Sequence, residues 1–220
     1  MNDVTNMNTG LDVAGLEEED ALALEGSFKA ILKYGPEIVT DTSISSTILA
    51  KLIENRLFNS RATVRIVNTF RLQKEVFDYF ILQVEIDHGF RDSKKNGNTN
   101  RDREYQIWGY GKSRIAFGDV LMRRLAFVDK LLNRFTSGRI KFDYSLEFNA
   151  KYYLISAGKD LILKHFEPNF VAAVAQSDEL IMLVNGVDVI IGFPVIINDQ
   201  NTVTLQKIMS SASFLAKSMM

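Results

Sequence analysis

The sequence predicts an α+β fold, with a largely antiparallel sheet and amphipathic helices packed on it. Segments with apolar residues at helical spacing alternate with short segments rich in β-branched and aromatic residues. Two apolar runs near the end are joined by Asn185-Gly186, a dipeptide typical of tight hairpins. With 220 residues, 46% hydrophobic and 24% charged, the chain has an ordinary globular composition. These observations favour a folded protein and exclude a collagen-like or disordered chain.

The first residues predict a flexible acidic tail. Residues 1–25 hold seven acidic residues and no Lys or Arg, so the rest of the chain carries all 26 basic residues against the other 20 acidic ones. Few large apolar side chains are present to offset the entropy of ordering this segment. We therefore expect a tail over residues 1–26, with at most a short helix over 17–24. A single α+β domain is expected over residues 27–220.

The first half of the domain predicts one helix and a hairpin. Asp41 and Thr42 are capping candidates before a helix over residues 43–57, whose apolar residues are Ile44, Ile48, Leu49, Leu52 and Ile53. The period then changes to two around residues 64–66 and again over 76–86, with RLQKE between them as a turn. Residues 91–103 lack apolar residues and predict an exposed, mobile loop before a strand over 104–110.

The middle of the chain predicts a strand, a helix and two more strands. SRIAF is expected as a strand, and the clearest amphipathic helix follows, with Leu121, Leu125, Val128, Leu132 and Phe135 at steps of four and three. Its opposite face is basic, and Ser137-Gly138 is expected to end it. The segments RIKFDY and AKYYLIS are expected as strands.

The last third predicts three helices around a hairpin. One helix is expected over residues 159–166, stopped by Pro168, and a short one over 170–175. Both strands of the Asn185-Gly186 hairpin are apolar on nearly every residue, so we expect the hairpin to be covered on both faces. A final helix is indicated by the apolar residues Leu205, Ile208, Ala212, Leu215 and Met219.

The residue types exclude several kinds of chemistry. The absence of cysteine excludes a disulfide scaffold and a thiol nucleophile, and it fits a reducing compartment. His88 and His165 are the only histidines, which excludes a His-rich metal cluster. Gly-Lys-Ser at 111–113 resembles the end of a phosphate-binding loop, but Gln106 stands where that loop requires glycine. We expect no metal, no cofactor and no catalytic residue.

One segment is a candidate anion-binding site. The loop over residues 91–103 has a net charge of +3, and its basic residues are Arg91, Lys94, Lys95, Arg101 and Arg103. Tyr105, Trp108 and Tyr110 follow closely, and basic residues beside aromatic ones suit a single-stranded nucleic acid. Alternation along a strand places at least one set of these aromatic residues in the core. A solvated loop is the alternative, and a sequence pI near 6.2 argues against a nucleic-acid protein.

Three stretches resemble an uncharacterised bacterial family whose members typically have membrane-spanning helices near the N-terminus and a soluble α+β domain. These stretches are VFDYF, the block IKFDYSLEFNAKYYLISAGKDLILKHFEPNF, and the hairpin with the final helix. Together they cover roughly residues 67–215. The sequence departs from the family in showing neither a signal peptide nor about 18 consecutive apolar residues. We therefore expect a soluble, cytoplasmic protein that is peripheral to a membrane if it is associated with one. The resemblance brings no catalytic residues.

Charge segregation without a catalytic motif favours a non-enzymatic interaction or accessory module. Such a module is expected to dock on a protein partner or on the inner face of a membrane, directly or through that partner. Two alternatives stay open: an enzyme whose site no linear motif reveals, and a weak nucleic-acid or phosphate binder that uses residues 91–103. The sequence does not determine the oligomeric state.

Overall fold

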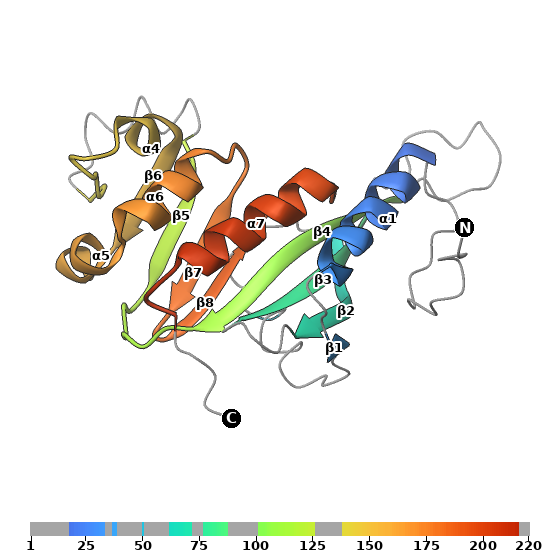
Figure 1. Ribbon diagram of the computed structural model, residues 1–220, viewed down its shortest axis with the longest axis horizontal. Helices are drawn as coiled ribbons and strands as arrows, with labels where there is room; N and C mark the ends of the chain where they lie inside the picture. Colours follow the sequence, from blue (N-terminus) through green and yellow to red (C-terminus); the bar gives the residue numbers. More distant parts are fainter. Residues whose placement is uncertain are drawn as a thin grey trace.

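The computed structural model describes residues 18–33, 37–38, 50, 62–71, 77–87, 101–125 and 138–215. This part of the chain confirms the α+β prediction, with one antiparallel sheet and helices packed against it (Figure 1). The strands are β1 (Glu37–Ile38), β2 (Ala62–Arg71), β3 (Phe77–Asp87), β4 (Arg101–Lys112), β5 (Val120–Arg124), β6 (Tyr152–Ser156), β7 (Ile181–Asn185) and β8 (Asp188–Gly192). The helices with described bounds are α1 (Glu18–Leu32), α4 (Leu146–Lys151), α5 (Lys159–His165), α6 (Pro168–Ala175) and α7 (Asp199–Ser211).

The strands of the sheet lie in the order β1-β2-β3-β4-β8-β7-β5-β6. Every described pairing is antiparallel, and β4 pairs with β8 although about 80 residues separate them in sequence. This pairing joins an N-terminal group of strands, β1 to β4, to a C-terminal group that holds β5 to β8. The centre of the sheet is therefore built from two distant parts of the chain.

Helix α7 covers one face of the sheet at this junction. It lies across β4 and β8 and contacts α6 on one side and α1 on the other (Figure 1). The absence of a side chain at Gly109 lets α7 approach closely, because a Cβ there would lie 3.1 Å from Cε of Met209. Leu205, Ile208 and Met209 point into the core. The last helix is thus confirmed as a cover of the sheet.

The two predicted hairpins are confirmed. Strands β2 and β3 pair from Arg71 opposite Asp78 onward, with a register shift between Ile66 and Asn68. The β7–β8 hairpin turns one residue later than predicted, because Asn185 pairs with Asp188 and leaves residues 186–187 as the loop. Gly186 takes a φ of +63°, which glycine adopts without steric cost. The hairpin is buried on both faces, as its apolar runs predict.

The prediction for residues 113–124 is wrong. SRIAF is a bend with one bridge at Ser113, and the segment predicted to open the amphipathic helix is strand β5. Strand β5 is paired on both sides, with β6 and β7, so Val120 and Met122 are buried. Two rows of sheet hydrogen bonds thus override a helical pattern that begins at Leu121. The rest of that predicted helix, residues 126–137, lies outside the described residues.

The prediction for residues 139–151 is also wrong. RIKFDY forms only one bridge, Arg139 with Ile155, and ends in a turn. Helix α4 follows, and only Tyr152–Ser156 of the predicted strand AKYYLIS is extended. Ser145 caps α4, since its side chain accepts a hydrogen bond from the backbone N–H of Phe148 at 3.3 Å. Helix α5 is confirmed, and Pro168 both ends that helical segment and begins α6.

The predicted boundary between tail and domain, at residues 26 and 27, falls inside α1. This helix is longer than the short one expected over residues 17–24, and it buries Leu24, Phe28 and Ile31 in the core. Residues 1–17 lie outside the described residues, so the tail they are expected to form stays a prediction. Of the helix predicted over residues 43–57, the structure describes Ala50 alone, and Ala50 is helical.

Candidate interaction surface

Of the five predicted anion-binding residues, the structure describes two. Arg91, Lys94 and Lys95 lie outside the described residues. Arg101 and Arg103 are the first and third residues of β4. The strand therefore begins before the predicted end of the loop at residue 103. The register places Arg101 opposite Asp87 and Arg103 opposite Glu85. Anion binding at these residues stays a prediction.

The aromatic residues after this segment are not placed to stack on a nucleic-acid base. Tyr105 and Trp108 are buried, on opposite faces of β4. The indole of Trp108 lies directly over Gly192, where an added Cβ would approach its Cδ2 to 2.3 Å. Its Nε1 donates to Oε1 of Gln106 at 3.2 Å. Base stacking requires an exposed ring, so neither side chain serves a single-strand binder in this fold.

Tyr110 is partly buried and ties β4 to β8. Its hydroxyl donates to Oδ1 of Asp188 at 2.7 Å. Burial first, and then the hydrogen bond and charge of Asp188, raise the pKa of Tyr110 well above the ordinary value of a tyrosine. The phenol stays protonated over the physiological pH range and acts as a structural hydrogen-bond donor.

The remaining motifs take structural positions. Ser113 of Gly-Lys-Ser is buried, and its hydroxyl donates to the carbonyl of Phe214 at 3.2 Å, so no phosphate-binding loop forms there. His165 is partly buried with its ring edge-on to Phe117, and His88 lies outside the described residues. Within the described ranges, no three His, Asp or Glu side chains are grouped to hold a metal ion.

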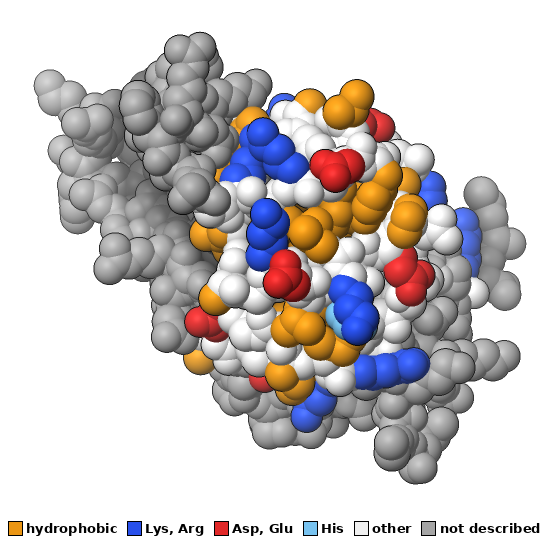
Figure 2. Space-filling view, turned by 90° about the vertical axis from the view of Figure 1, so that its left-hand side faces the viewer, with side chains coloured by type: hydrophobic (Ala, Val, Ile, Leu, Met, Phe, Trp, Pro, Cys, Tyr) orange, Lys and Arg blue, Asp and Glu red, His pale blue; other side chains and the backbone are white. Residues whose placement is uncertain are grey.

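The feature that stands out is a surface at the end of the molecule formed by α4 and α5, which we call the α4–α5 surface. Figure 2 shows this end, where apolar side chains gather among Lys, Asp and Glu. Its exposed apolar residues are Tyr144, Leu146, Leu161 and Leu163, and the exposed charged residues beside them are Lys141, Asp143, Glu147, Lys159, Asp160 and Lys164. Leu146 is 82% exposed, the largest exposure among the large apolar side chains of the described residues.

The turn that presents Tyr144 and Leu146 is held by hydrogen bonds. The side chain of Asn149 accepts from the backbone N–H of Phe142 at 3.0 Å and donates to its carbonyl at 2.7 Å. The backbone N–H of Ser145 donates to the same carbonyl at 3.1 Å. The side chain of Arg139 donates to the carbonyls of Asn149 and Tyr152. Leu146 is thus held at the start of α4, directly after a hydrogen-bonded turn.

The turn is also fixed against α5. The hydroxyl of Tyr144 donates to the carbonyl of Phe166 at 2.7 Å, at the end of the helix that carries Leu161 and Leu163. Beneath the turn, the rings of Phe142 and Phe148 meet edge to face at 5.1 Å. The ring of Phe142 is stacked on that of Phe166, whose ring stacks in turn on Phe214. This buried aromatic cluster supports both halves of the surface.

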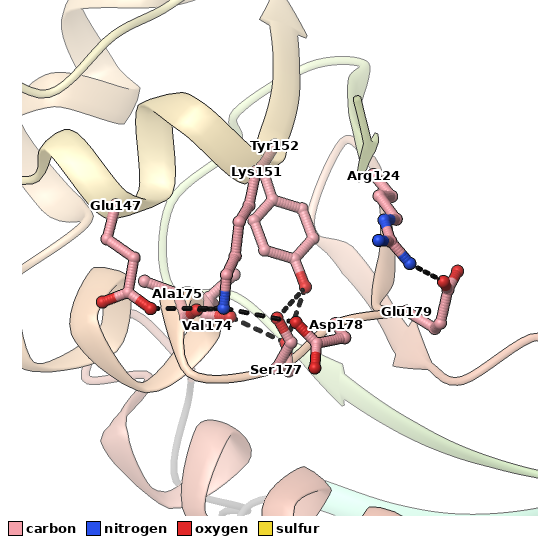
Figure 3. Close-up of polar contacts among 9 residues, drawn as sticks. All are labelled: Arg124, Glu147, Lys151, Tyr152, Val174, Ala175, Ser177, Asp178 and Glu179. Atoms are coloured by element: carbon pink, nitrogen blue, oxygen red, sulfur yellow. Dashed lines mark hydrogen bonds and ion pairs between the residues drawn. The ribbon is translucent and has the colours of Figure 1, made fainter. Parts of the chain in front are cut away.

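A polar network attaches α4 and β6 to the end of α6 (Figure 3). Nζ of Lys151 donates to the carbonyl of Ala175 at 2.8 Å and forms ion pairs with Glu147 and Asp178, both at 3.2 Å. A lysine at this position suits the negative end of the helix dipole of α6. Burial acts to lower the pKa of Lys151, but the bonds to Glu147 and Asp178 outweigh it and raise that pKa.

The next residue completes the attachment. The hydroxyl of Tyr152 lies 2.7 Å from Oγ of Ser177 and donates to the carbonyl of Ser177 at 3.0 Å, while Oγ of Ser177 donates to the carbonyl of Val174 (Figure 3). Burial raises the pKa of Tyr152. These contacts are satisfied within the fold and leave no unused group, which makes this network a support of the surface and not a reactive site.

Most charges of the α4–α5 surface form no ion pair with other described residues. Lys141, Lys159, Lys164, Asp143 and Asp160 have no ion-pair partner in the part of the chain that the structure describes. The surface thus combines exposed apolar side chains with charges of both signs around them. Many protein interfaces likewise have an apolar centre and a polar rim.

Sequence reasoning missed this surface because it assigned residues 139–144 to a strand, in which Tyr144 would alternate with core residues. The available signal was Ser145, a preferred N-cap residue directly before LEFNAK, which indicates a helix start.

Comparisons with known proteins identify no family for this chain. No family model matches it, and no curated protein matches. Among solved structures, the crystal structure of the mycobacterial trehalose monomycolate transport factor A, TtfA, is similar with a TM-score of 0.45 and 11% sequence identity. The similarity covers 89% of this chain and 97% of that chain. Likeness at this level carries no argument about function.

Among the described residues, no helix combines the length and the apolar character that a membrane crossing requires.

Proposed function

We propose that this chain is a non-enzymatic interaction module whose α4–α5 surface docks on a protein partner. The observation that carries the proposal is Leu146, an 82% exposed leucine at the start of α4, directly after the hydrogen-bonded turn that carries Tyr144. Covering one leucine side chain contributes about 2 kcal/mol to association. Interface energy is concentrated in a few residues whose surroundings exclude water, and tyrosines such as the neighbouring Tyr144 are enriched among them.

The charges around the anchors favour a protein over a lipid surface. Three lysines and two aspartates without ion-pair partners among the described residues leave the surface close to neutral. An anionic bilayer attracts clusters of like positive charge and repels the two aspartates. A protein partner supplies charges of both signs at fixed positions, which gives specificity and orientation.

The resemblance to a membrane-anchored bacterial family extends the proposal to the location of the partner. A partner at the cytoplasmic face of a membrane would make this chain a peripheral component of a membrane-bound assembly. Fractionation of cells tests this part separately: the natural chain is expected with the membrane fraction, and the Leu146→Ser variant with the soluble one.

The test of the docking surface is a photo-cross-linker placed at position 146 of the full chain in cells of the source organism. We expect a defined protein adduct that disappears when Leu161 and Leu163 are changed to Ser. The matched control carries the cross-linker at Val203, an exposed position on α7 at a distance from the surface, and is expected to give no such adduct.

Two outcomes would overturn the proposal. One is an absence of any protein adduct at position 146. The other is an adduct that forms equally at positions 146 and 203. Sedimentation with anionic vesicles that depends on Leu146, without a protein adduct, would assign the surface to a bilayer.

A further inference from the structure

The tip of the β7–β8 hairpin carries the dipeptide Asn185-Gly186. Asn185 is the last residue of β7 and is exposed, and Gly186 is the first residue of the two-residue loop. Gly186 has a φ of +63°, so a residue with a side chain would be strained at this position. The fold therefore requires a glycine directly after an exposed asparagine.

An asparagine followed by glycine is prone to a reaction with its own backbone. The backbone nitrogen of the glycine loses its proton and attacks Cγ of the asparagine side chain, which closes a succinimide ring and releases ammonia. Water then opens the ring to aspartate or isoaspartate, so one side-chain amide is exchanged for one carboxylate. Glycine favours the attack because no side chain hinders the approach of its nitrogen. The reaction needs only water.

In the folded chain, both reacting groups are held by Gly118 and Asp119, the two residues before β5. The backbone N–H of Gly186 donates to the carbonyl of Gly118 at 3.1 Å. Nδ2 of Asn185 donates to Oδ1 of Asp119 at 2.9 Å. The first bond keeps the proton on the attacking nitrogen, and the second holds the amide group that leaves as ammonia. The reaction therefore requires the hairpin tip to separate from Gly118 and Asp119.

This separation is a local event at the surface. Two further backbone bonds fasten the tip, from Phe117 to the carbonyl of Gly186 at 3.0 Å and from Ser113 to the carbonyl of Val187 at 2.6 Å. The tip itself is open to solvent, since Asn185 is exposed and Val187 is 39% exposed, whereas the strands behind it are buried. Exposed loops open locally far more often than buried strands separate. The fold thus slows the reaction without preventing it.

We propose that Asn185 is a site of spontaneous deamidation and that Gly118 and Asp119 set its rate. The inference is independent of the α4–α5 surface. It stands on the Asn-Gly sequence, the exposure of the tip and the two hydrogen bonds that hold the reacting groups.

Deamidation also changes how the tip docks. An aspartate at position 185 places a second carboxylate where the amide of Asn185 now bonds to Asp119. The attraction of a hydrogen bond is then replaced by the repulsion of like charges. The modified tip is therefore held less tightly against Asp119 than the natural one.

The first experiment measures deamidation of the full chain at physiological temperature and pH. Mass spectrometry of proteolytic peptides follows the reaction, because the exchange of an amide for a carboxyl group changes the peptide mass and fragmentation locates it. Asn185 is expected to react in the folded chain, and more slowly than in urea. The same dipeptide recurs as Asn96-Gly97 and is the internal reference in urea, where both sites are expected to react at similar rates. A folded chain that reacts at Asn185 as fast as the chain in urea would overturn the control by the fold.

The second experiment removes the contact with Asp119. Asp119→Ala is expected to raise the rate at Asn185 in the folded chain by about fivefold, because the loss of one hydrogen bond raises the opened fraction by about that factor. The rate in urea is expected to stay unchanged. The matched control, Glu19→Ala, removes one exposed acidic side chain from α1 and is expected to react like the natural chain. Equal rates in the natural chain and in Asp119→Ala, or an equal rise in both variants, would overturn the inference.

The third experiment tests the effect of the product on the fold. Asn185→Asp, which reproduces the aspartate product, is expected to unfold at lower urea concentration than Asn185→Ser, which loses the same hydrogen bond without a new charge. The difference is expected to shrink at high salt, where exposed charges are screened. In an Asp119→Ala background the two variants are expected to unfold at the same urea concentration, because the pair of like charges is absent. Equal midpoints with Asp119 present, or a difference that persists without Asp119, would overturn the predicted repulsion at the tip.

Discussion

Large apolar side chains are buried at the centre of the sheet but exposed on the α4–α5 surface. At the centre, where β4 pairs with β8 beneath α7, Ile107, Trp108 and Ile191 are fully buried. In α5, one residue of seven is buried, and Leu146 in α4 is 82% exposed although its turn is tightly hydrogen-bonded. Rigidity and burial are therefore separate properties in this fold. The centre is rigid because it is packed, whereas the surface is rigid while its apolar groups stay available.

The largest effect is expected from Gly192→Ala at the centre. The new Cβ would lie 2.3 Å from Cδ2 of Trp108, a side chain that is fully buried and has no space to move into. We expect the free energy of unfolding to fall by about 3 kcal/mol or more, comparable with the loss of a buried aromatic side chain. Urea unfolding measures the change. Gly138→Ala, where a Cβ meets no atom within 4 Å, is the control, and an equal loss in both variants would contradict the packing argument.

An intermediate effect is expected where the surface is attached to the core. Tyr152→Phe removes the hydroxyl that bonds to Ser177 between β6 and the end of α6. We expect a loss of about 1 to 1.5 kcal/mol of unfolding free energy, the usual value for one buried hydrogen bond. The half-buried neighbour on the same strand provides the control as Tyr153→Phe. A loss below about 0.3 kcal/mol would show that the network does not hold α6 in place.

Alkaline pH is expected to weaken the centre through Tyr110. An ordinary tyrosine loses its proton near pH 10, and burial with the bond to Asp188 raises the pKa of Tyr110 in the folded state. The folded protein therefore holds this proton when the unfolded chain has released it. The stabilisation is present below about pH 10 and is lost as the pH rises above it.

Urea unfolding at several pH values above 9 tests this expectation. The natural chain is expected to lose more stability with rising pH than Tyr110→Phe. Asp188→Asn is expected to lie between them, because burial and the charge of Asp78 then maintain only part of the rise in the pKa of Tyr110. Parallel pH curves for all three proteins would contradict the role given to Tyr110.

The smallest effect on stability is expected at the surface. Leu146→Ser changes a side chain that makes little contact with the fold, so the free energy of unfolding is expected to stay within about 0.5 kcal/mol of the natural value. The same change is expected to abolish the cross-linked adduct. Thermal unfolding and the adduct yield, measured on one preparation, check both halves. A clear loss of stability would show that Leu146 serves the fold.

The sequence predicted those elements whose signals are local. Pro168 separates α5 from α6, and Gly186 adopts the positive φ angle that the Asn-Gly signal indicates. The same local reasoning failed at residues 120–124, where helical spacing from Leu121 is real but the segment pairs with β6 and β7. These partners lie about 30 and 60 residues away in the chain, and no local pattern reports on them.

The same contrast between local signals and contacts of distant segments applies to the fold as a whole and to the candidate surface. The sequence by itself determined the fold class, the two hairpins, the helices after residue 158 and the segregation of acidic from basic residues, because each follows from neighbouring residues or from composition. Only the tertiary structure decided that β4 pairs with β8, that Trp108 is buried while Leu146 is exposed, and that α1 and α5 lie at opposite ends. The physical reason is that burial and position depend on contacts between distant segments, which form only when the whole sheet is assembled.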